Sequence, residues 1–336
     1  MLKILGWDGY EEGYKRTFDA FQEDTGIRIS FYGVPNQDEM HKLALTQEFD
    51  IACPTTDRLM SWCSSDLIAP LDETRIGYER IEPTLHADAH TVIDGKRMGS
   101  PCVWGGAGIG HHTGKAPIVS ARVSLMDLFD PVYAGQLAMR EDTAFVAVGR
   151  ALEEGGKLPY PFADSYLVED RMIANYDVIG AFLAKHSNHV ARFWFSEEEG
   201  VNVFRSGDCI IGYSWDSSLA KLDRAGLPFR FVAPREGAIC YLQNFVISKK
   251  ADKGLAQEWI AWVNTPKGSA YYASALGVNP CAIGAMDLMD ANVQDFIARS
   301  YPPEAQLKLW WQPEQPVWFI KNRENYARAY RNLVGK

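Results

Sequence analysis

The 336 residues are 47% hydrophobic and 12% aromatic, so they hold enough apolar side chains for sizeable cores, and the length predicts about two domains. Lys and Arg number 34 against 43 Asp and Glu, giving a formal net charge of -9. This charge disfavours nucleic acid as a partner, because such partners require a basic surface. No apolar run approaches the roughly 18 residues of a membrane span.

The start of the chain and its cysteines are informative about the cellular location of the protein. Residues 1–7 lack the charged and apolar regions of an export signal, so we expect any such signal to have been removed or never to have existed. The six cysteines are too widely spaced for a CxxC zinc or redox site. We expect buried free thiols, with one or two disulfides as the alternative in a secreted protein. The cysteines are Cys53, Cys63, Cys102, Cys209, Cys240 and Cys281.

Strands and helices alternate along the chain. A strand is predicted over 2–6 and a helix over 10–24, because Tyr14, Phe18 and Phe21 share one face and Gly26 follows as a left-handed cap. The later expected elements are strands 27–32, 49–54, 229–233 and 239–248, and helices 38–47, 253–263, 266–276 and 322–333. This alternation predicts an α/β fold whose mostly parallel sheet has helices on both faces.

Two segments are candidate crossings between lobes. Residues 99–110 form an apolar strand rich in glycine, which can twist or bend. Residues 229–245 contain two strands on either side of Pro234–Ala238. Two separate crossings make each lobe discontinuous in sequence. The expected parts are 1–106 and 238–292 for lobe 1, 107–237 and 293–336 for lobe 2, and hinges near 104–108 and 234–240.

Motifs for catalysis and for cofactors do not match. Gly106–Gly110 resembles a dinucleotide fingerprint, but histidine and threonine stand where GxGxxG needs its last glycine. GxSxG, HExxH and P-loop motifs are missing from the sequence, so neither an enzyme nor a cofactor is expected. His111 and His112 are adjacent and point different ways, which does not suit a shared metal. Tyr271 and Tyr272 can be compared with the paired tyrosines of ferric-ion binders, but they fall on a predicted helix, where core packing accounts for them.

Five short motifs carry a resemblance to a known family. Trp7–Tyr10, Thr25–Ile27, Asp50–Thr56, Pro101–Gly105 and Pro234–Ala238 follow one another at spacings that closely resemble the spermidine/putrescine-binding proteins of bacterial ABC importers. The resemblance covers essentially the whole chain. It implies the two-lobed type II periplasmic-binding-protein fold, with mixed sheets, helices on both faces and a ligand cleft between the lobes. It also implies a monomeric periplasmic protein that closes on a ligand and is recognised by a membrane permease.

The resemblance also implies a set of ligand contacts. In the family a polyamine lies between aromatic rings, and carboxylates hold its ammonium groups, because an ammonium removed from water needs acidic partners and gains attraction from a ring face. The residues that match the family's ligand positions are Trp7, Tyr10, Trp215, Tyr241, Asp142, Gln312, and Thr55 and Thr56 at a loop where a serine commonly contacts ligand.

Departures from the family pattern bear on the ligand. The aspartate that usually grips an amine is Gln243 here, the acid three residues beyond Asp142 is Phe145, and a usual tyrosine is Val278. Tyr241 stands where tryptophan is usual. An unpaired buried ammonium costs several kcal/mol, so the remaining acids suit one amine better than two or three.

These departures favour a zwitterion such as γ-aminobutyrate or a related ω-amino acid. Asp216 or Asp142 is expected to hold its ammonium group. Arginine suits the carboxylate through bidentate hydrogen bonds, and Arg192 is the first choice, with Arg205 the second. The alternative ligand is a polyamine such as putrescine or spermidine. An enzyme or a ferric-ion carrier on the same fold is the remaining alternative.

Overall fold

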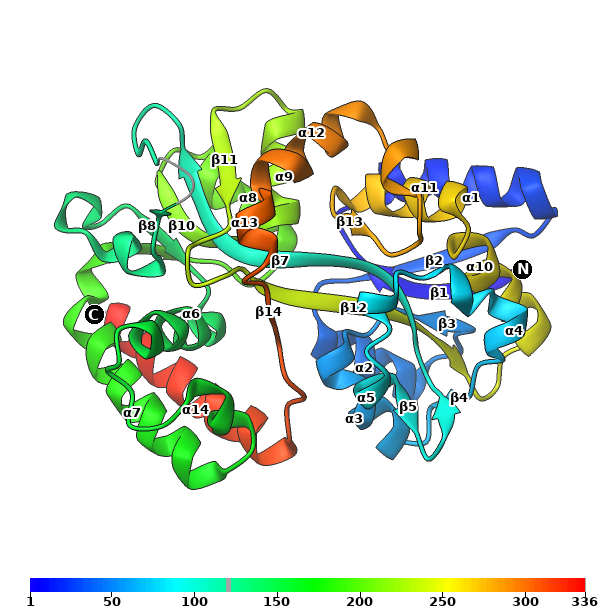
Figure 1. Cartoon of the computed structure of the whole chain (residues 1–336), viewed down its shortest axis with the longest axis horizontal. Helices are drawn as coiled ribbons and strands as arrows, with labels where there is room; N and C mark the ends of the chain where they lie inside the picture. Colours follow the sequence, from blue (N-terminus) through cyan, green and yellow to red (C-terminus); the bar gives the residue numbers. More distant parts are fainter. Residues whose placement is uncertain (119–121, 336) are drawn as a thin grey trace. The chain divides into compact units, whose positions relative to one another are not determined.

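The computed structural model describes residues 1–118 and 122–335, which form two compact units. Unit 1 comprises Met1–Gly105 and Tyr241–Ile297, and unit 2 comprises Gly106–Cys240 and Ala298–Lys336. The chain passes between the units within strand β7 (Ser100–His112), strand β12 (Ile239–Ser248) and helix α12 (Ala291–Ser300) (Figure 1). The α/β class predicted from the alternation of strands and helices is confirmed.

Unit 1 is built on a sheet in which β1 lies between β2 and β3, all parallel, and β12 joins β3 in the antiparallel direction. Its strands are β1 (Leu2–Trp7), β2 (Ile29–Val34), β3 (Ile51–Ala52), β4 (Ile68–Ala69), β5 (Val92–Ile93), β6 (Lys96–Arg97) and β13 (Asn279–Pro280). Its helices are α1 (Glu11–Thr25), α2 (Gln37–Thr46), α3 (Leu59–Ser64), α4 (Glu73–Ile76), α5 (Asp88–Thr91), α10 (Lys253–Val263) and α11 (Pro266–Leu276). Helices α1 and α11 cover one face, and α2 and α3 cover the other (Figure 1).

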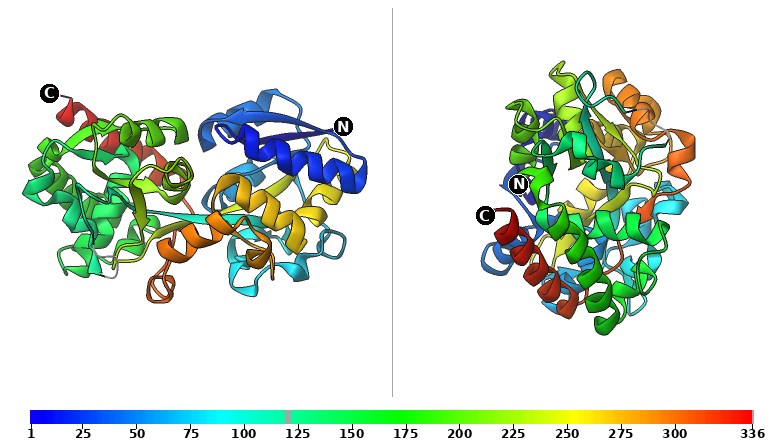
Figure 2. Two further views of the ribbon diagram at one scale, coloured as in Figure 1. Left: turned by 90° about the horizontal axis from the view of Figure 1, so that it is seen from above. Right: turned by 90° about the vertical axis from the view of Figure 1, so that its left-hand side faces the viewer.

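Helix α1 shows how the sequence pattern builds this unit. Tyr14 and Phe21 are buried, and the ring of Phe21 meets Trp259 of α10 edge to face at 5.0 Å. Gly26 ends the helix with φ 75°, and its N–H donates to the carbonyl of Gln22, as the sequence predicts. Gly13 lets α1 approach α11, since a Cβ there would lie 2.8 Å from the backbone of Ala275. Figure 2 shows the two helices alongside each other.

In unit 2, β10 lies between β7 and β8, with β9 beyond β8 and β11 on the other side of β7. Its strands are β8 (Leu137–Met139), β9 (Val190–Phe193), β10 (Ile211–Trp215), β11 (Phe229–Val232) and β14 (Trp310–Trp311). Its helices are α6 (Glu141–Glu154), α7 (Glu169–Lys185), α8 (Glu197–Arg205), α9 (Asp216–Arg224), α13 (Pro303–Gln306) and α14 (Val317–Val334).

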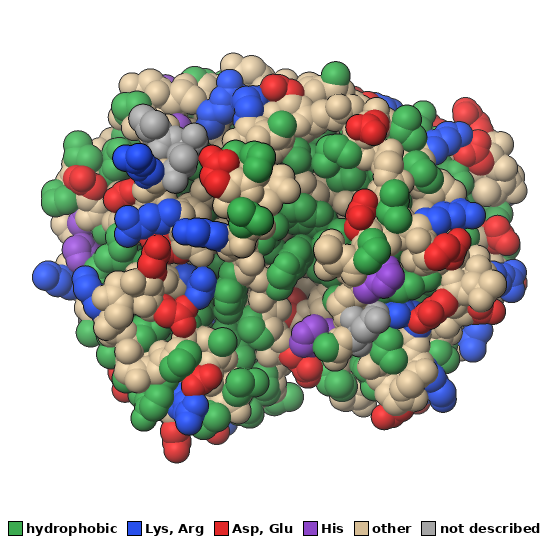
Figure 3. Space-filling model, in the orientation of Figure 1, with side chains coloured by type: hydrophobic (Ala, Val, Ile, Leu, Met, Phe, Trp, Pro, Cys, Tyr) green, Lys and Arg blue, Asp and Glu red, His purple; other side chains and the backbone are tan. Residues whose placement is uncertain are grey.

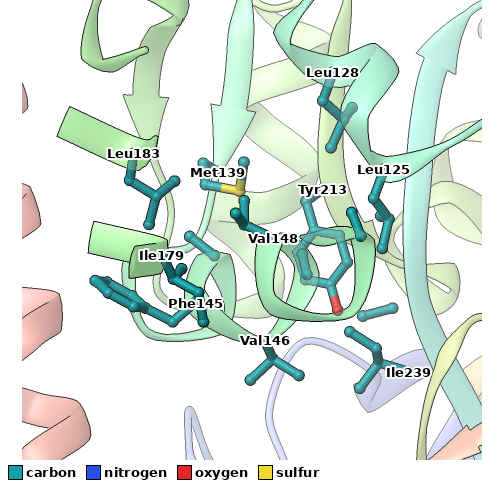
Figure 4. Close-up of a cluster of buried hydrophobic side chains, with 14 of the residues drawn as sticks. Leu125, Leu128, Met139, Phe145, Val146, Val148, Ile179, Leu183, Tyr213 and Ile239 are labelled. Carbon is teal, nitrogen blue, oxygen red and sulfur yellow. The ribbon is translucent and has the colours of Figure 1, made fainter. Parts of the chain in front are cut away.

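The core of unit 2 is filled from helices α6 and α7 and from the sheet. Met139 and Tyr213 project from neighbouring strands toward Val148 of α6, and Phe145 lies beside Ile179 of α7 (Figure 4). Phe145 stacks on Tyr176 with ring centroids 5.1 Å apart. Phe145, which stands where the resemblance implies an acid, is therefore a core residue of this unit.

Most predicted elements lie where the sequence places them, with two informative shifts. Helices α10 and α11 and strand β12 have the predicted bounds. Strand β3 is limited to Ile51–Ala52 instead of 49–54, and it ends shortly before Pro54, whose ring nitrogen has no hydrogen to donate. Helix α14 begins at Val317 instead of Asn322, because Phe319 in its first turn is fully buried and stacks on Tyr166 at 4.2 Å.

All six cysteines are free thiols, five of them buried and Cys63 half-buried, which agrees with the first of the two sequence expectations. Acidic and basic side chains are interspersed on the face drawn in Figure 3. In the part of the chain that the structure describes, every helix is too short or too polar to cross a membrane.

Candidate functional site

Asp216 directly follows strand β10 and is the first residue of helix α9, where the helix dipole favours an acid. Its side chain is only 1% exposed. Oδ2 accepts hydrogen bonds from the Gly106 N–H at 3.1 Å and from the Tyr301 hydroxyl at 2.6 Å, and Oδ1 accepts one from the Ser217 N–H at 2.8 Å. These donors account for a buried carboxylate without an ammonium ligand.

Trp215, the last residue of β10, is half-buried and lies beside a second tryptophan. Its ring meets Trp194 edge to face at 4.8 Å, and the indole N–H of Trp194 donates to the carbonyl of Tyr213. The guanidinium carbon of Arg140 lies over both rings, 5.0 Å from the centre of Trp215 and 5.8 Å from that of Trp194. One face of Trp215 is therefore already next to a cation.

Arg140 immediately precedes helix α6 and pairs with Asp142 in its first turn. Nε of Arg140 donates to Oδ1 of Asp142 at 2.8 Å, and the Thr143 N–H donates to the same oxygen at 2.9 Å. Burial opposes ionisation of Asp142, but the charges of Arg140 and Arg323 outweigh it and hold the pKa of the carboxyl below its ordinary value. The carboxyl group is therefore an anion with a fixed cationic partner.

The remaining residues predicted in unit 2 make contacts elsewhere than with Arg140 and Asp142. Arg192 on β9 is 63% exposed, and its Nε donates to Asp208 at 3.4 Å. Arg205 ends helix α8 and is exposed. Gln312 follows strand β14, and its backbone N–H donates to the carbonyl of Cys240 at 3.1 Å. Within the described residues, none of these contacts joins Arg192, Arg205 or Gln312 to Arg140 or Asp142.

In unit 1, two predicted aromatic residues lie at the carboxyl end of strand β1, where Trp7 is its last residue, and just beyond it. Trp7 is half-buried, and its indole Nε1 is a buried donor without a partner among the described residues. Tyr10 precedes helix α1, is nearly buried and packs edge to face on Tyr14 with ring centroids 6.1 Å apart. The carboxyl ends of parallel strands are where α/β proteins bind ligands.

The threonines and Gln243 come together at the end of strand β3. Thr55 and Gln243 form an antiparallel bridge, and the Thr56 hydroxyl donates to the carbonyl of Leu242 at 3.1 Å. Nδ2 of Asn244 donates to the Thr56 hydroxyl at 2.7 Å. Oε1 of Gln243 is buried and lacks a donor among residues 1–118 and 122–335. Tyr241, two residues earlier on β12, is half-buried.

Three residues of these clusters were not predicted from the sequence. Arg140 lies within the motif that identified Asp142, and its position before an acidic first turn was the available signal. Asn244 and Trp194 are recognisable only through contacts with residues distant in the chain.

Side chains that bind metals do not gather anywhere in the described ranges. No group of three or more His, Cys, Asp or Glu in residues 1–118 and 122–335 is placed to hold a metal ion. Nδ1 of buried His111 lies 2.8 Å from the carbonyl of Ala116, whereas Nδ1 of His112 accepts from Gly114 N–H. Tyr272 is buried next to Cys53, and Tyr271 lies under Arg16.

Comparison with known families shows that this is a solute-binding protein. Residues 16–298 match the model of the bacterial extracellular solute-binding proteins, and the chain belongs to this family. A spermidine/putrescine-binding periplasmic protein of Escherichia coli is 23% identical over 283 residues, which are 82% of this chain and 76% of that protein.

Solved structures agree on the fold. The spermidine/putrescine-binding protein PotD of Streptococcus pneumoniae superposes with a TM-score of 0.78 at 18% identity, covering 99% of both chains. The Atu4243-GABA receptor superposes with a TM-score of 0.70 at 17% identity, covering 99% of this chain and 97% of the receptor. The two-lobed periplasmic-binding-protein fold expected from the sequence is confirmed.

Proposed function

We propose that this protein is the periplasmic solute-binding component of an ABC importer, which captures a small amino compound by lobe closure and delivers it to a membrane permease. Its membership in the extracellular solute-binding family and its similarity to periplasmic relatives support this proposal. A ligand that contacts both lobes favours the closed state by the free energy of its additional contacts.

Within the amino compounds, we propose a zwitterionic amino acid, with γ-aminobutyrate and other ω-amino acids first. The observation that carries this choice is the 2.8 Å ion pair between Asp142 and Arg140. Asp142 occupies a position where the resemblance implies an amine contact, yet a fixed cation already neutralises it. Gln243 stands at a second such position and has no charge.

The charges near this position argue against a dication. Arg140, Arg323 and Asp142 together carry a formal charge of one positive unit, because the two arginines outnumber the one acid. Each ammonium group of a polyamine placed here gains less from Asp142 than it would from an unpaired acid, and it is repelled by both arginines. A ligand with one carboxylate and one ammonium group avoids this penalty at its anionic end.

The second candidate ligand is a polyamine, and the relatives favour it. The curated protein of Escherichia coli and the solved protein of Streptococcus pneumoniae are both named for spermidine and putrescine. In that case the second ammonium group must meet an acid at another position, because Asp142 is already paired with Arg140 and Gln243 is uncharged.

A binding screen separates the candidates. Purified protein is titrated by calorimetry and thermal shift with γ-aminobutyrate, 5-aminovalerate, α-amino acids, putrescine and spermidine. Ligand at about 100 times its Kd stabilises a protein by about 2.7 kcal/mol, which shifts the unfolding temperature measurably. Binding of amino acids alone supports the zwitterion, and binding of putrescine or spermidine alone contradicts it. Failure of every amino compound to bind would overturn the proposed ligand class.

A further inference from the structure

We propose that Arg140 is the residue that receives the carboxylate of the ligand and thereby sets the preference for amino acids over polyamines. This inference rests on the proposed function, whose site it deepens. It transfers the carboxylate contact, which the sequence assigned to Arg192, to an arginine held next to Trp215.

The surroundings of Arg140 hold its guanidinium group in place. Trp215 and Trp194 lie beneath it, and Trp194 is itself fixed by its hydrogen bond to the Tyr213 carbonyl. Asp142 accepts from Nε, which sets the rotation of the guanidinium plane. A group oriented before the ligand arrives loses little side-chain freedom on binding, so more of the interaction contributes to affinity.

The terminal nitrogens of Arg140 remain available to a ligand. In the described part of the chain, Nε is the only guanidinium nitrogen of Arg140 with a hydrogen-bond partner. The Arg140 side chain is 19% exposed, so the group is neither sealed in the core nor fully solvated. Nη1 and Nη2 form the fork that binds a carboxylate through two parallel hydrogen bonds.

The local charges fit an anionic group better than a cationic one. Arg323 adds a second positive charge near Asp142, and Glu141 next in sequence is paired with Arg331 at 2.8 Å. A carboxylate bound at Arg140 brings the sum over Arg140, Arg323 and Asp142 from one positive charge to zero. An ammonium group bound against the same face of Trp215 would have to displace Arg140 from that ring.

Arg192 lacks these features. It is 63% exposed, and its Nε already lies 3.4 Å from Asp208, which is an ordinary surface ion pair. Arg192 is therefore a matched control for Arg140, with the same residue type, the same unit and a carboxylate partner in each case.

The test compares Arg140→Gln, Arg140→Lys and Arg192→Gln with the unaltered protein by calorimetry. The probes are γ-aminobutyrate, its primary amide 4-aminobutanamide, in which an uncharged amide replaces the carboxylate, and putrescine, in which an aminomethyl group replaces it. Arg140→Gln is expected to weaken γ-aminobutyrate at least about tenfold, because charge-assisted hydrogen bonds are lost. The affinity for 4-aminobutanamide should change little and that for putrescine should rise. Arg192→Gln should change none of the three by more than about twofold.

Arg140→Lys keeps the charge and the partner of Asp142, so it tests the proposal if Arg140→Gln fails to fold. We expect an intermediate affinity for γ-aminobutyrate, because lysine cannot form the bidentate pair. An unchanged ratio of γ-aminobutyrate to putrescine affinity in both variants would overturn the assignment of Arg140 and leave the solute-binding function intact. Preference of the unaltered protein for putrescine would also overturn it. Failure of every probe and amino acid to bind would overturn the proposed ligand class and the inference with it.

Discussion

The hydroxyl of Tyr301 donates a hydrogen bond of 2.6 Å to Oδ2 of Asp216, and both side chains are buried in unit 2. Tyr301 directly follows helix α12, whereas Asp216 begins helix α9. The Gly106 N–H of strand β7 donates to the same carboxylate oxygen. The carboxylate thus joins three segments of unit 2 that are distant in sequence.

Tyr301→Phe is expected to lower the free energy of unfolding by about 1–3 kcal/mol, because it leaves the buried carboxylate with one donor fewer. Urea unfolding followed by fluorescence measures the change. Tyr271→Phe is the control, since that tyrosine is only half-buried and lies under Arg16. Equal stability of the two variants would contradict a structural role for the Tyr301 hydrogen bond.

Gly106→Ala is expected to destabilise the protein more than Gly114→Ala. A Cβ at position 106 would lie 2.8 Å from the Tyr301 hydroxyl and would displace it from Asp216. A Cβ at position 114 meets its nearest atom at 3.6 Å, which is ordinary contact. Thermal unfolding of the two variants without ligand checks the difference. Similar unfolding temperatures would mean that Tyr301 moves away from the added methyl group and keeps its hydrogen bond to Asp216.

The Asp142 carboxyl is expected to make stability depend on pH. Its pKa is lowered in the folded state, so its contribution is complete above the unfolded value of about 3.9 and is lost as the pH falls through the lower folded pKa. The stability difference between the unaltered protein and Asp142→Asn should therefore shrink below pH of about 4. Urea unfolding at several pH values measures it.

Glu141 supplies a control, because its contribution to stability is expected to change with pH in the opposite direction. Burial raises the pKa of its carboxyl despite the nearby Arg331, so its ionised form is less favourable in the folded than in the unfolded chain. Relative to Glu141→Gln, the unaltered protein should gain stability as the pH falls through the raised folded pKa toward the unfolded value. A parallel loss of stability at both positions would contradict this assignment.

Gln243→Glu is expected to move the preference toward polyamines. It restores a carboxylate where the resemblance implies an amine contact. In the absence of ligand the variant should be less stable, because Oε1 of Gln243 is buried without a donor among the described residues. Putrescine should raise its unfolding temperature more than that of the unaltered protein. Gln257→Glu, another buried glutamine of unit 1, should leave the putrescine response unchanged.

The cysteines should react slowly with alkylating reagents in the native protein. Burial raises the pKa of the half-buried Cys63 thiol to about 11 and that of Cys209 to about 12, so the reactive thiolates are scarce at neutral pH. Cys63 is expected to react first, and faster as the pH rises, whereas all six thiols should react in denaturant. Mass spectrometry of the alkylated protein counts them. Fewer than six in denaturant would indicate a disulfide.

The fold was more accessible from the sequence than the site. Helices α10 and α11 carry clear apolar periodicity and end signals, so their bounds were predictable from local residues. The start of α14 was not predictable from local residues. Its first turn depends on burial of Phe319 against Tyr166, which lies on a distant segment.

The properties of the candidate site depend even more on contacts that the sequence does not reveal. Asp142 was recognised from its motif, yet the neutralisation of its charge depends on Arg140, two residues away, and on Arg323 from helix α14. The bridge of Thr55 to Gln243 joins residues far apart in the chain. The resemblance identified both of them, but the lack of a donor for the Gln243 oxygen appears only in three dimensions.

The division of each unit between two stretches of chain sets an order of assembly. During synthesis, residues 106–240 emerge before Tyr241–Ile297 supply the remaining part of unit 1, including the half of β12 that pairs with β3. Unit 2 in turn waits for residues 298–335, which bring Tyr301 to Asp216. Such long-range contacts slow folding, because the entropy cost of closing the loop arises before the stabilising contacts can form. A truncation within helix α14 should therefore leave residues made much earlier exposed to proteases.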